Sequence, residues 1–280
     1  MTRVRDVVEV VMQAYPPSLA EDWDTGIGLT CGDPDDGVKS VLLAVDADQV
    51  TVGEAIRVGA GMLLTHHPLL FRPVQSVAAT TPKGALVHRL IRAGVAHFAA
   101  HTNADAAEGG VNDALSAVLG LTDLRPLVPR DDGTTGSGRV GRLRVPMSLR
   151  EFTSHVAQRL PITVGGVRAA GDADRLLRTV AVCGGAGDGY LAAAAGAGAD
   201  VYLTSDLRHH VVAEFVAEPG NPAVVDVAHW AGEWPWLGVA AGAIASELPG
   251  LAVLVSTMRT DPWTVHAASG PAAIGPAAIG

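Results

Sequence analysis

Short apolar segments alternate with amphipathic helical segments along most of this 280-residue chain, and this alternation constrains its fold more than any other feature. Such alternation is typical of βαβ units with a largely parallel sheet, so we expect an α/β fold class. The expected strands cover residues 40–45, 62–65 and 95–100 in a first block, and 140–145, 177–182, 200–204, 224–227 and 252–255 in a second. The expected helices cover residues 3–14, 51–58, 83–93, 111–119, 149–160, 189–197, 207–216 and 237–247.

The two blocks resemble each other, which predicts two similar α/β lobes. Because the candidate ligands described below come from both blocks, we expect the metal site in the cleft between the lobes. The pattern Gly-Ala-x, two hydrophobic residues and Leu-Thr occurs at 59–65 and again at 198–204, each time where a helix would end and a strand begin. Between the blocks the chain is rich in Pro, Gly, Asp and Thr, as in a surface loop. We therefore expect an N-terminal lobe over 1–122, a linker loop over 123–138, a C-terminal lobe over 139–266 and a flexible tail over 267–280.

Composition argues against several classes of protein. The formal charge of −9 disfavours a general electrostatic grip on nucleic acid, although a local basic groove stays open. The longest apolar stretch, residues 236–255, contains Glu247 and Pro249, which argues against a membrane span. Two widely separated cysteines, Cys31 and Cys183, and an N-terminus without a signal-peptide pattern favour the reducing cytoplasm.

Histidines and carboxylates gather directly after three of the expected strands. The clusters are His66 and His67 after strand 62–65, His101 and Asp105 after strand 95–100, and His229 and Glu233 after strand 224–227. Ligands of open parallel sheets bind beyond the carboxyl ends of the strands, so we expect all three clusters at that edge. Taken singly, each cluster is as readily explained by surface histidines or a local hydrogen bond. Their shared position is what points to one site.

Several imidazoles and two carboxylates, without cysteine, form a ligand set that suits divalent transition metals such as Zn, Fe or Mn. A carboxylate can bridge two such ions and offset their mutual repulsion. Two ions about 3.5–4 Å apart activate a bridging water and stabilise both the attacking and the leaving oxygen. The sequence therefore predicts a hydrolytic or Lewis-acid dinuclear centre rather than a structural zinc site.

A glycine-rich run, Gly184 to Gly189, follows the strand expected at 177–182. It lacks the Lys-Ser/Thr of a P-loop and the full dinucleotide-binding fingerprint. Its backbone amides could hold an anion at the start of the next helix, or the run could be a simple tight turn. Asp46 ends the first expected strand and is expected to orient a ligand histidine.

These motifs, in this order, resemble the NIF-three-like dinuclear metal-centre proteins, also known as GTP cyclohydrolase I type 2 homologues. The matching motifs are Trp23-Asp24-x-Gly26-x-Gly28, Thr65-His66-His67-Pro68, His101-Thr102-Asn103-Ala104-Asp105, Thr204-Ser205-Asp206 with His210, and His229-x-x-x-Glu233. The resemblance spans residues 4–263. Thr25, Ser205 and Ala228 differ from the residues usual in the family, and none of them is an expected ligand.

The resemblance implies a two-lobed α/β subunit, a ring-shaped homohexamer and two metal ions per subunit in the cleft. The ligands it implies are His66, His67, Asp105, His229 and Glu233, with the two carboxylates as candidate bridges. It also places His101 close to the metals, in an orienting or proton-transfer role. The short segment between the lobes, where some members carry a large inserted domain, indicates the short form of the family.

The expected function is a metal-dependent hydrolase. A hydroxide bridging the two ions would attack a phosphoester, nucleotide or purine-type substrate, and His101 or His210 would assist proton transfer. The alternative is a non-enzymatic metal-binding ring or a regulatory scaffold. An open metal position would favour catalysis, and ions saturated by protein ligands would favour the alternative.

Overall fold

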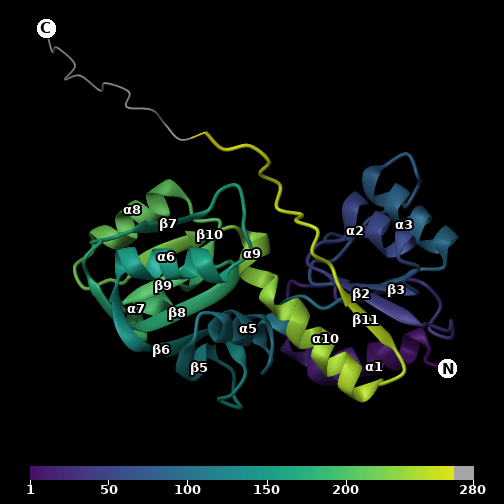
Figure 1. Cartoon of the computed structure of the whole chain (residues 1–280), viewed down its shortest axis with the longest axis horizontal. Helices are drawn as coiled ribbons and strands as arrows, with labels where there is room; N and C mark the ends of the chain where they lie inside the picture. The colour runs from purple at the N-terminus through teal and green to yellow at the C-terminus, as the bar shows by residue number, and fades with distance from the viewer. Residues whose placement is uncertain (268–280) are drawn as a thin grey trace, which may run out of the picture.

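The computed structural model describes residues 1–267, and residues 268–280, which include nearly all of the expected tail, lie outside the described part. The described chain forms two lobes, each built on one sheet with helices packed against it (Figure 1). Parallel strands occupy the centre of both sheets. The expected α/β fold class is therefore confirmed.

The first lobe is built on a five-stranded sheet. Its elements are α1 (Val4–Ala14), a 3-10 turn (Pro17–Leu19), β1 (Gly28–Cys31), β2 (Ser40–Ala44), α2 (Gln49–Arg57), β3 (Met62–Thr65), α3 (Pro82–Ala93), β4 (Ala96–Ala99) and, from late in the chain, β11 (Ala252–Val255). The strand order is β1-β4-β3-β2-β11, and only β1 runs antiparallel to its neighbour. β3 and β4 are buried along their whole length, which explains why they are nearly continuous in apolar residues rather than alternating.

The second lobe is built on a six-stranded sheet. Two helices, α4 (Thr102–Ala106) and α5 (Val111–Val118), lead into β5 (Leu121–Pro129), β6 (Gly136–Ser148), α6 (Leu149–Arg159), β7 (Val167–Ala170), β8 (Leu176–Ala186), a 3-10 turn (Asp188–Tyr190), α7 (Leu191–Gly196), β9 (Val201–Ser205), α8 (His209–Ala217), β10 (Ala223–Val227), α9 (His229–Glu233) and α10 (Pro235–Glu247). The strand order is β5-β6-β8-β9-β10-β7, with β8, β9 and β10 parallel and the outer strands antiparallel.

The segment 123–138, expected to be a linker loop, forms most of a β-hairpin in the second sheet. β5 and β6 pair from Leu121 opposite Leu143 to Pro129 opposite Gly136. The prolines that suggested a loop, Pro126 and Pro129, are tolerated because β5 is an edge strand, where a missing backbone N–H breaks no ladder on the open side. The chain therefore passes from one lobe to the other through α4 and α5 and not through a loop.

The strand at 252–255 was expected in the second lobe, and this expectation is wrong. β11 pairs in parallel with β2 of the first sheet. The helix before it, α10, packs against α1, where the rings of Tyr15 and Trp236 meet edge to face at 5.4 Å. Local periodicity identified the strand, but it carries no information about which strand is its partner.

The internal repeat found in the sequence occupies equivalent places in the two lobes. Gly59 and Gly198 both adopt a left-handed backbone conformation, with φ of 69° and 71°, where a helix ends before a central strand. The strands that follow, β3 and β9, each lie between two parallel neighbours. Among the described residues the longest helix has 13 residues, and no helix has both the length and the apolar character that crossing a bilayer requires.

One buried apolar cluster continues through both lobes. It contains Leu43 and Phe98 from the first sheet, Leu115 from α5, Val182 from the second sheet and Trp236 from α10. The lobes therefore share a core, and the walls of the cleft between them are fixed relative to each other.

Candidate metal centre

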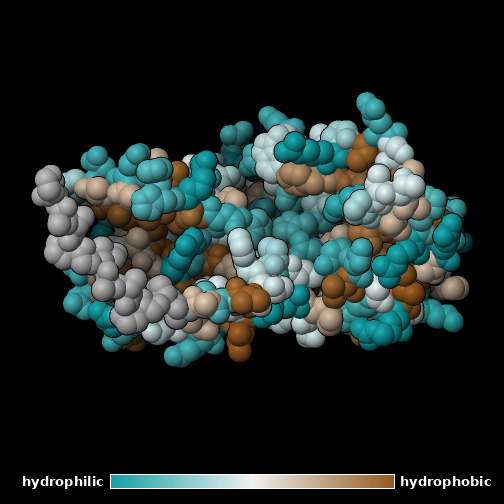
Figure 2. All heavy atoms as spheres, turned by 90° about the horizontal axis from the view of Figure 1, so that it is seen from above, coloured by the Kyte–Doolittle hydropathy of each residue, from teal (hydrophilic) through white to brown (hydrophobic). Residues whose placement is uncertain are grey.

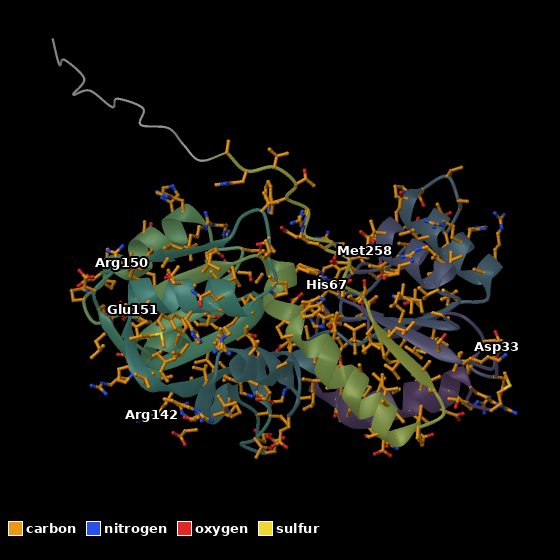
Figure 3. The ribbon with its side chains drawn as sticks, viewed as in Figure 1. Asp33, His67, Arg142, Arg150, Glu151 and Met258 are labelled. Carbon is orange, nitrogen blue, oxygen red and sulfur yellow. The ribbon has the colours of Figure 1, made fainter. Side chains whose placement is uncertain are left out.

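A cleft of about 1150 Å³ opens between the lobes, where the central strands of both sheets end. The first lobe contributes His67 and His101 to its walls, and the second lobe contributes Asp226 and His229. Hydrophilic side chains gather in the hollow at the middle of the molecule (Figure 2). His67 lies between the two lobes (Figure 3). The three predicted clusters thus share this cleft.

His66 and His67 follow β3 directly and enter the base of the cleft. Their backbone N–H groups bond to carbonyl groups at the end of β2, which fixes the start of the turn. Nδ1 of His66 donates to the carbonyl oxygen of Ala100 at 3.0 Å, and Nδ1 of His67 donates to Oδ1 of Asp46 at 2.7 Å. Because each Nδ1 is occupied, each Nε2 is left to bind a metal ion. Asp46 thus orients His67, a candidate ligand, as its position in the sequence predicts.

The one-turn helix α9 places His229 and Glu233 on the same face, with Nε2 of His229 2.9 Å from Oε1 of Glu233. Nδ1 of His229 donates to Oδ2 of Asp206 at 2.6 Å. Asp206 has a φ of 59°, a left-handed conformation that costs a residue other than glycine about 1 kcal/mol or more. The strained turn after β9 therefore directs this carboxylate at the imidazole.

The segment after β4 supplies His101, which precedes α4, and Asp105, which lies within α4. Oδ1 of Asp105 lies 3.6 Å from Nε2 of His66. Oδ2 of Asp24 accepts from Nδ1 of His101 at 2.8 Å and from the backbone N–H and the hydroxyl of Thr102. Burial would raise the pKa of Asp24, but these donors hold it well below its usual range. Asp24 therefore stays ionised and fixes the ring of His101.

The ligand atoms of these side chains converge. Nε2 of His67 lies 3.0 Å from Oε2 of Glu233 and 3.2 Å from Nε2 of His229, and Nε2 of His66 lies 3.4 Å from Oε1 of Glu233. Among residues 1–267, the buried Nε2 of His66 and Oδ1 of Asp105 have no hydrogen-bond partner. Buried polar atoms of this kind are costly unless something binds them. Three imidazoles and two carboxylates in this arrangement fit a divalent metal ion.

His101 lies closer to the cluster than an outer orienting role requires. One ligand atom of each of His66, His67 and His101 lies within 4.8 Å of the others, as is also true of His67, His229 and Glu233. The ring centroid of His101 is 5.2 Å from that of His66 and 5.7 Å from that of His67. His101 is thus placed either to bind a metal ion or to exchange protons beside it.

His210, the other residue expected to transfer protons, does not reach the cleft. β9 ends at Ser205 and α8 begins at His209, so His210 lies in the first turn of that helix. It is exposed, its ring contacts His209 at a centroid distance of 5.1 Å, and it is absent from the cleft lining among the described residues. The three-residue extension between strand and helix carries His210 past the cleft, and its expected role is not supported.

The charges in the cluster compensate one another. Burial would lower the pKa values of His67 and His229, but the carboxylate of Glu233 and those behind the rings raise them to about 10 and about 11. Burial would raise the pKa of Glu233, but the neighbouring imidazoles hold it well below its usual range. Burial and the charge of Glu233 together raise the pKa of Asp105 to about 7. Without metal, protons on the two histidines supply the positive charge that these carboxylates require.

The glycine run that begins in the last residues of β8 lies directly against this cluster. Gly185 has a φ of 70°, and a Cβ atom there would lie 2.5 Å from Oε1 of Glu233 and 3.2 Å from Nε2 of His229. The run's carbonyl oxygens accept hydrogen bonds within the lobe, Gly185 from the hydroxyl of Thr204 and Gly187 from that of Tyr202. The close approach of the backbone to Glu233 and His229 explains why residue 185 is glycine, and neither the anion-site nor the tight-turn interpretation of the sequence predicts this.

Replacing Gly185 by alanine is expected to weaken metal binding by about 10-fold or more, because the added methyl group displaces Glu233 and His229. Competition with a chromophoric chelator measures the affinity. Gly189→Ala is the matched control, since nothing lies within 4 Å of a Cβ there. Equal metal affinities of the two variants would contradict the prediction.

Comparison with known proteins identifies the family. The family model described as Duf34/NIF3 (NGG1p interacting factor 3) matches residues 2–262. The chain belongs to this family. A Duf34/NIF3 relative from Streptomyces coelicolor, named GTP cyclohydrolase 1 type 2 homolog, is 48% identical over 279 residues, covering 97% of each chain. A relative of the same name from Mycobacterium bovis is 38% identical over 377 aligned residues, covering 96% of this chain and 98% of its own.

Solved structures agree with this assignment. A Bacillus cereus protein related to NIF3 has a TM-score of 0.86 at 25% identity, covering 95% of this chain and 99% of its own. The resemblance to the Duf34/NIF3 family noted from the sequence is therefore confirmed. The alignment with the M. bovis relative has 377 positions against 280 residues here, so that relative carries residues that this chain lacks.

Proposed function

We propose that this protein is a metal-dependent hydrolase acting on a phosphoester, nucleotide or purine-type substrate, with two divalent transition-metal ions, Zn, Fe or Mn, as cofactors. The observation that supports the proposal is the convergence of imidazole Nε2 atoms and two buried carboxylates at the base of a cleft of about 1150 Å³. A cleft of this volume is large enough for a nucleotide-sized ligand.

The ions would be held by His66, His67, Asp105, His229 and Glu233. Bound there, they would supply an activated water and stabilise the negative charge that develops on the substrate. The ligand atoms come from both lobes, so the shared core that fixes the lobes also fixes the distances within the site.

The chain's other residues hold the site rigid and move protons. Asp46, Asp206 and the carbonyl oxygen of Ala100 each hold Nδ1 of one ligand histidine, which prevents the rings from rotating when a substrate enters. Asp24 does the same for His101, and we assign to Nε2 of His101 the transfer of a proton to or from the substrate.

The name of the relatives, GTP cyclohydrolase 1 type 2 homolog, favours a purine-type substrate within this class. Opening of a purine ring and hydrolysis of a phosphoester both begin with attack by water on an electrophilic centre. The same metal site could therefore serve either reaction.

The test is turnover by the full-length protein loaded separately with Zn²⁺, Mn²⁺ or Fe²⁺. The substrates are bis(4-nitrophenyl) phosphate, GMP and GTP. Turnover is measured by the release of nitrophenolate, by the release of phosphate and by the change in purine absorbance. We expect turnover with at least one metal, loss on adding a chelator and recovery on restoring the ion. His101→Asn should retain metal and lose about 100-fold or more in kcat. Protein carrying two metal equivalents that turns over none of these substrates would overturn the proposal and favour the scaffold alternative.

A further inference from the structure

Two large aromatic rings stand exposed on the first-lobe wall of the cleft. Trp23 is 61% exposed and Phe71 is 51% exposed, and both line the cleft. The chain contains only five Trp and four Phe, and Trp236, Phe98 and Phe152 are fully buried. Exposed aromatic rings that adjoin a functional cleft commonly mark a surface that contacts a ligand.

The rings form a corner beside the metal-binding cluster. The centroids of Trp23 and Phe71 are 6.1 Å apart with their planes inclined at 57°. Each ring meets the imidazole of His101 edge to face, at 6.0 Å from Trp23 and 5.7 Å from Phe71. We call this pair the aromatic corner. The inclination leaves no parallel slot between the rings, so a planar group would stack on the exposed face of one ring and touch the other with its edge.

The backbone that carries the aromatic corner is fixed before any ligand arrives. Next to Trp23, the carboxylate of Asp24 is held by donors from His101 and Thr102. A Cβ at Gly26 would lie 2.7 Å from the ring of Pro68, so the loop after Trp23 packs tightly on the segment that leads to Phe71. An exposed ring on a fixed backbone loses little conformational entropy when a ligand binds, so this subsite is preorganised.

The charges of the cleft indicate what such a subsite must supply. The carboxylates that line the cleft beyond the metal cluster include Glu21, Asp226 and Asp261. Among the described lining residues there is no lysine and a single arginine, Arg168, which is bonded to Asp226 at 2.7 Å. The described lining therefore offers a phosphate no lysine and no arginine without a carboxylate partner. Affinity beyond that of the metals has to come from contact with an uncharged part of the substrate.

We propose that the aromatic corner, Trp23 with Phe71, is a stacking subsite for the planar base of a nucleobase-bearing phosphate ester, whose phosphate lies at the metal cluster. This inference rests on the proposed function, because it takes the metal cluster as the phosphate site. Every nucleobase presents a π face, and stacking on an exposed indole or phenyl ring is how proteins bind bases without charged contacts. The proximity of His101 to both rings places the base-binding wall next to the proposed proton-transfer group.

The test compares two phosphates that differ only in whether a base is present. Isothermal titration calorimetry measures the Kd of GMP and of ribose 5-phosphate for the zinc-loaded full-length protein. We expect GMP to bind at least about 10-fold more tightly. Trp23→Ala and Phe71→Ala should each weaken GMP binding by about 5- to 100-fold and leave ribose 5-phosphate within about 2-fold, as expected for loss of one stacking contact. Trp23→Phe, which keeps a ring, should retain most of the affinity for GMP.

Two controls accompany the comparison. Zinc content must match the wild type in each variant, because Trp23 and Phe71 contact His101. Ile162→Ala removes a side chain that is 86% exposed outside this cleft and should change neither Kd. Equal affinities for GMP and ribose 5-phosphate, no binding of GMP, or equal weakening of both ligands by Trp23→Ala would each overturn the stacking subsite.

Failure of this proposal is distinguishable from failure of the proposed function. Metal-dependent turnover of bis(4-nitrophenyl) phosphate with no preference for GMP over ribose 5-phosphate would retain the hydrolase and remove the stacking subsite. Selective, Trp23-dependent binding of GMP without turnover of any substrate would retain the subsite and remove the hydrolase.

Discussion

Glu233→Gln is expected to lower the metal content of the purified protein from about two equivalents per subunit to less than one, with the fold retained. Glu233 is the side chain on which the cluster centres, because its two oxygens lie within 3.4 Å of Nε2 of His66, His67 and His229. Glutamine preserves the volume and removes the charge that offsets the ions. Removing an outer contact typically lowers metal affinity by about 10- to 100-fold, and removing a direct ligand should lower it further. We therefore expect the metal affinity to fall by about 100-fold or more.

Inductively coupled plasma mass spectrometry on protein purified without chelator or nickel resin measures the metal content. Glu214→Gln makes the same chemical change on the exposed face of α8 and should keep wild-type metal content. Circular dichroism of both variants should match the wild type, since the shared apolar core does not depend on the ions. Two metal equivalents bound to Glu233→Gln would remove Glu233 from the ligand set.

Arg139→Leu is expected to destabilise the protein by about 3 kcal/mol, the lower end of the range found when one partner of a buried ion pair is removed, because Asp113 is only partly buried. Arg139 lies on β6 and is 2% exposed, and its guanidinium donates to both carboxylate oxygens of Asp113 on α5, at 2.6 and 3.0 Å. It also donates to the carbonyl oxygens of Ala107, Gly136 and Gly138. Leucine would remove the charge that pairs with this carboxylate and three hydrogen bonds to carbonyl oxygens, and would leave Asp113 only the backbone N–H of Gly109 as a donor among the described residues.

Thermal unfolding followed by circular dichroism should show a Tm lower by roughly 10 °C, since each kcal/mol corresponds to about 2–4 °C in a chain of this size. Arg150→Leu, at the exposed start of α6, is the control and should shift the Tm by much less. Arg139→Leu/Asp113→Leu should recover part of the loss because no charge is left unpaired. A Tm for Arg139→Leu equal to that of Arg150→Leu would show that this pair does not stabilise the joint.

The position of the candidate site follows from the sequence because it depends on a general property of parallel sheets. His66, Asp105 and His229 are distant along the chain, yet each follows a strand whose carboxyl end must lie at the cleft edge of its sheet. The orienting contact of Asp46 follows from the same rule, since β2 lies beside β3.

Other features depend on contacts that no local pattern records. The partner of β11 is set by packing of α10 on α1, and the hairpin of β5 and β6 is hidden by prolines that only an edge strand tolerates. The need for glycine at 185 arises from a helix more than forty residues later in the chain. The homohexamer and the cytoplasmic location rest on resemblance and composition and stay predictions.

The return of β11 to the first sheet also sets the order in which the protein can be completed during synthesis. The first four strands of that sheet leave the ribosome early, but the outer edge of β2 stays without its parallel neighbour until residues 252–255 emerge. In that interval the backbone groups along β2 are open to pairing with another nascent chain. The lobe that begins folding first is thus finished last, and its exposed edge is where we expect a chaperone to be needed.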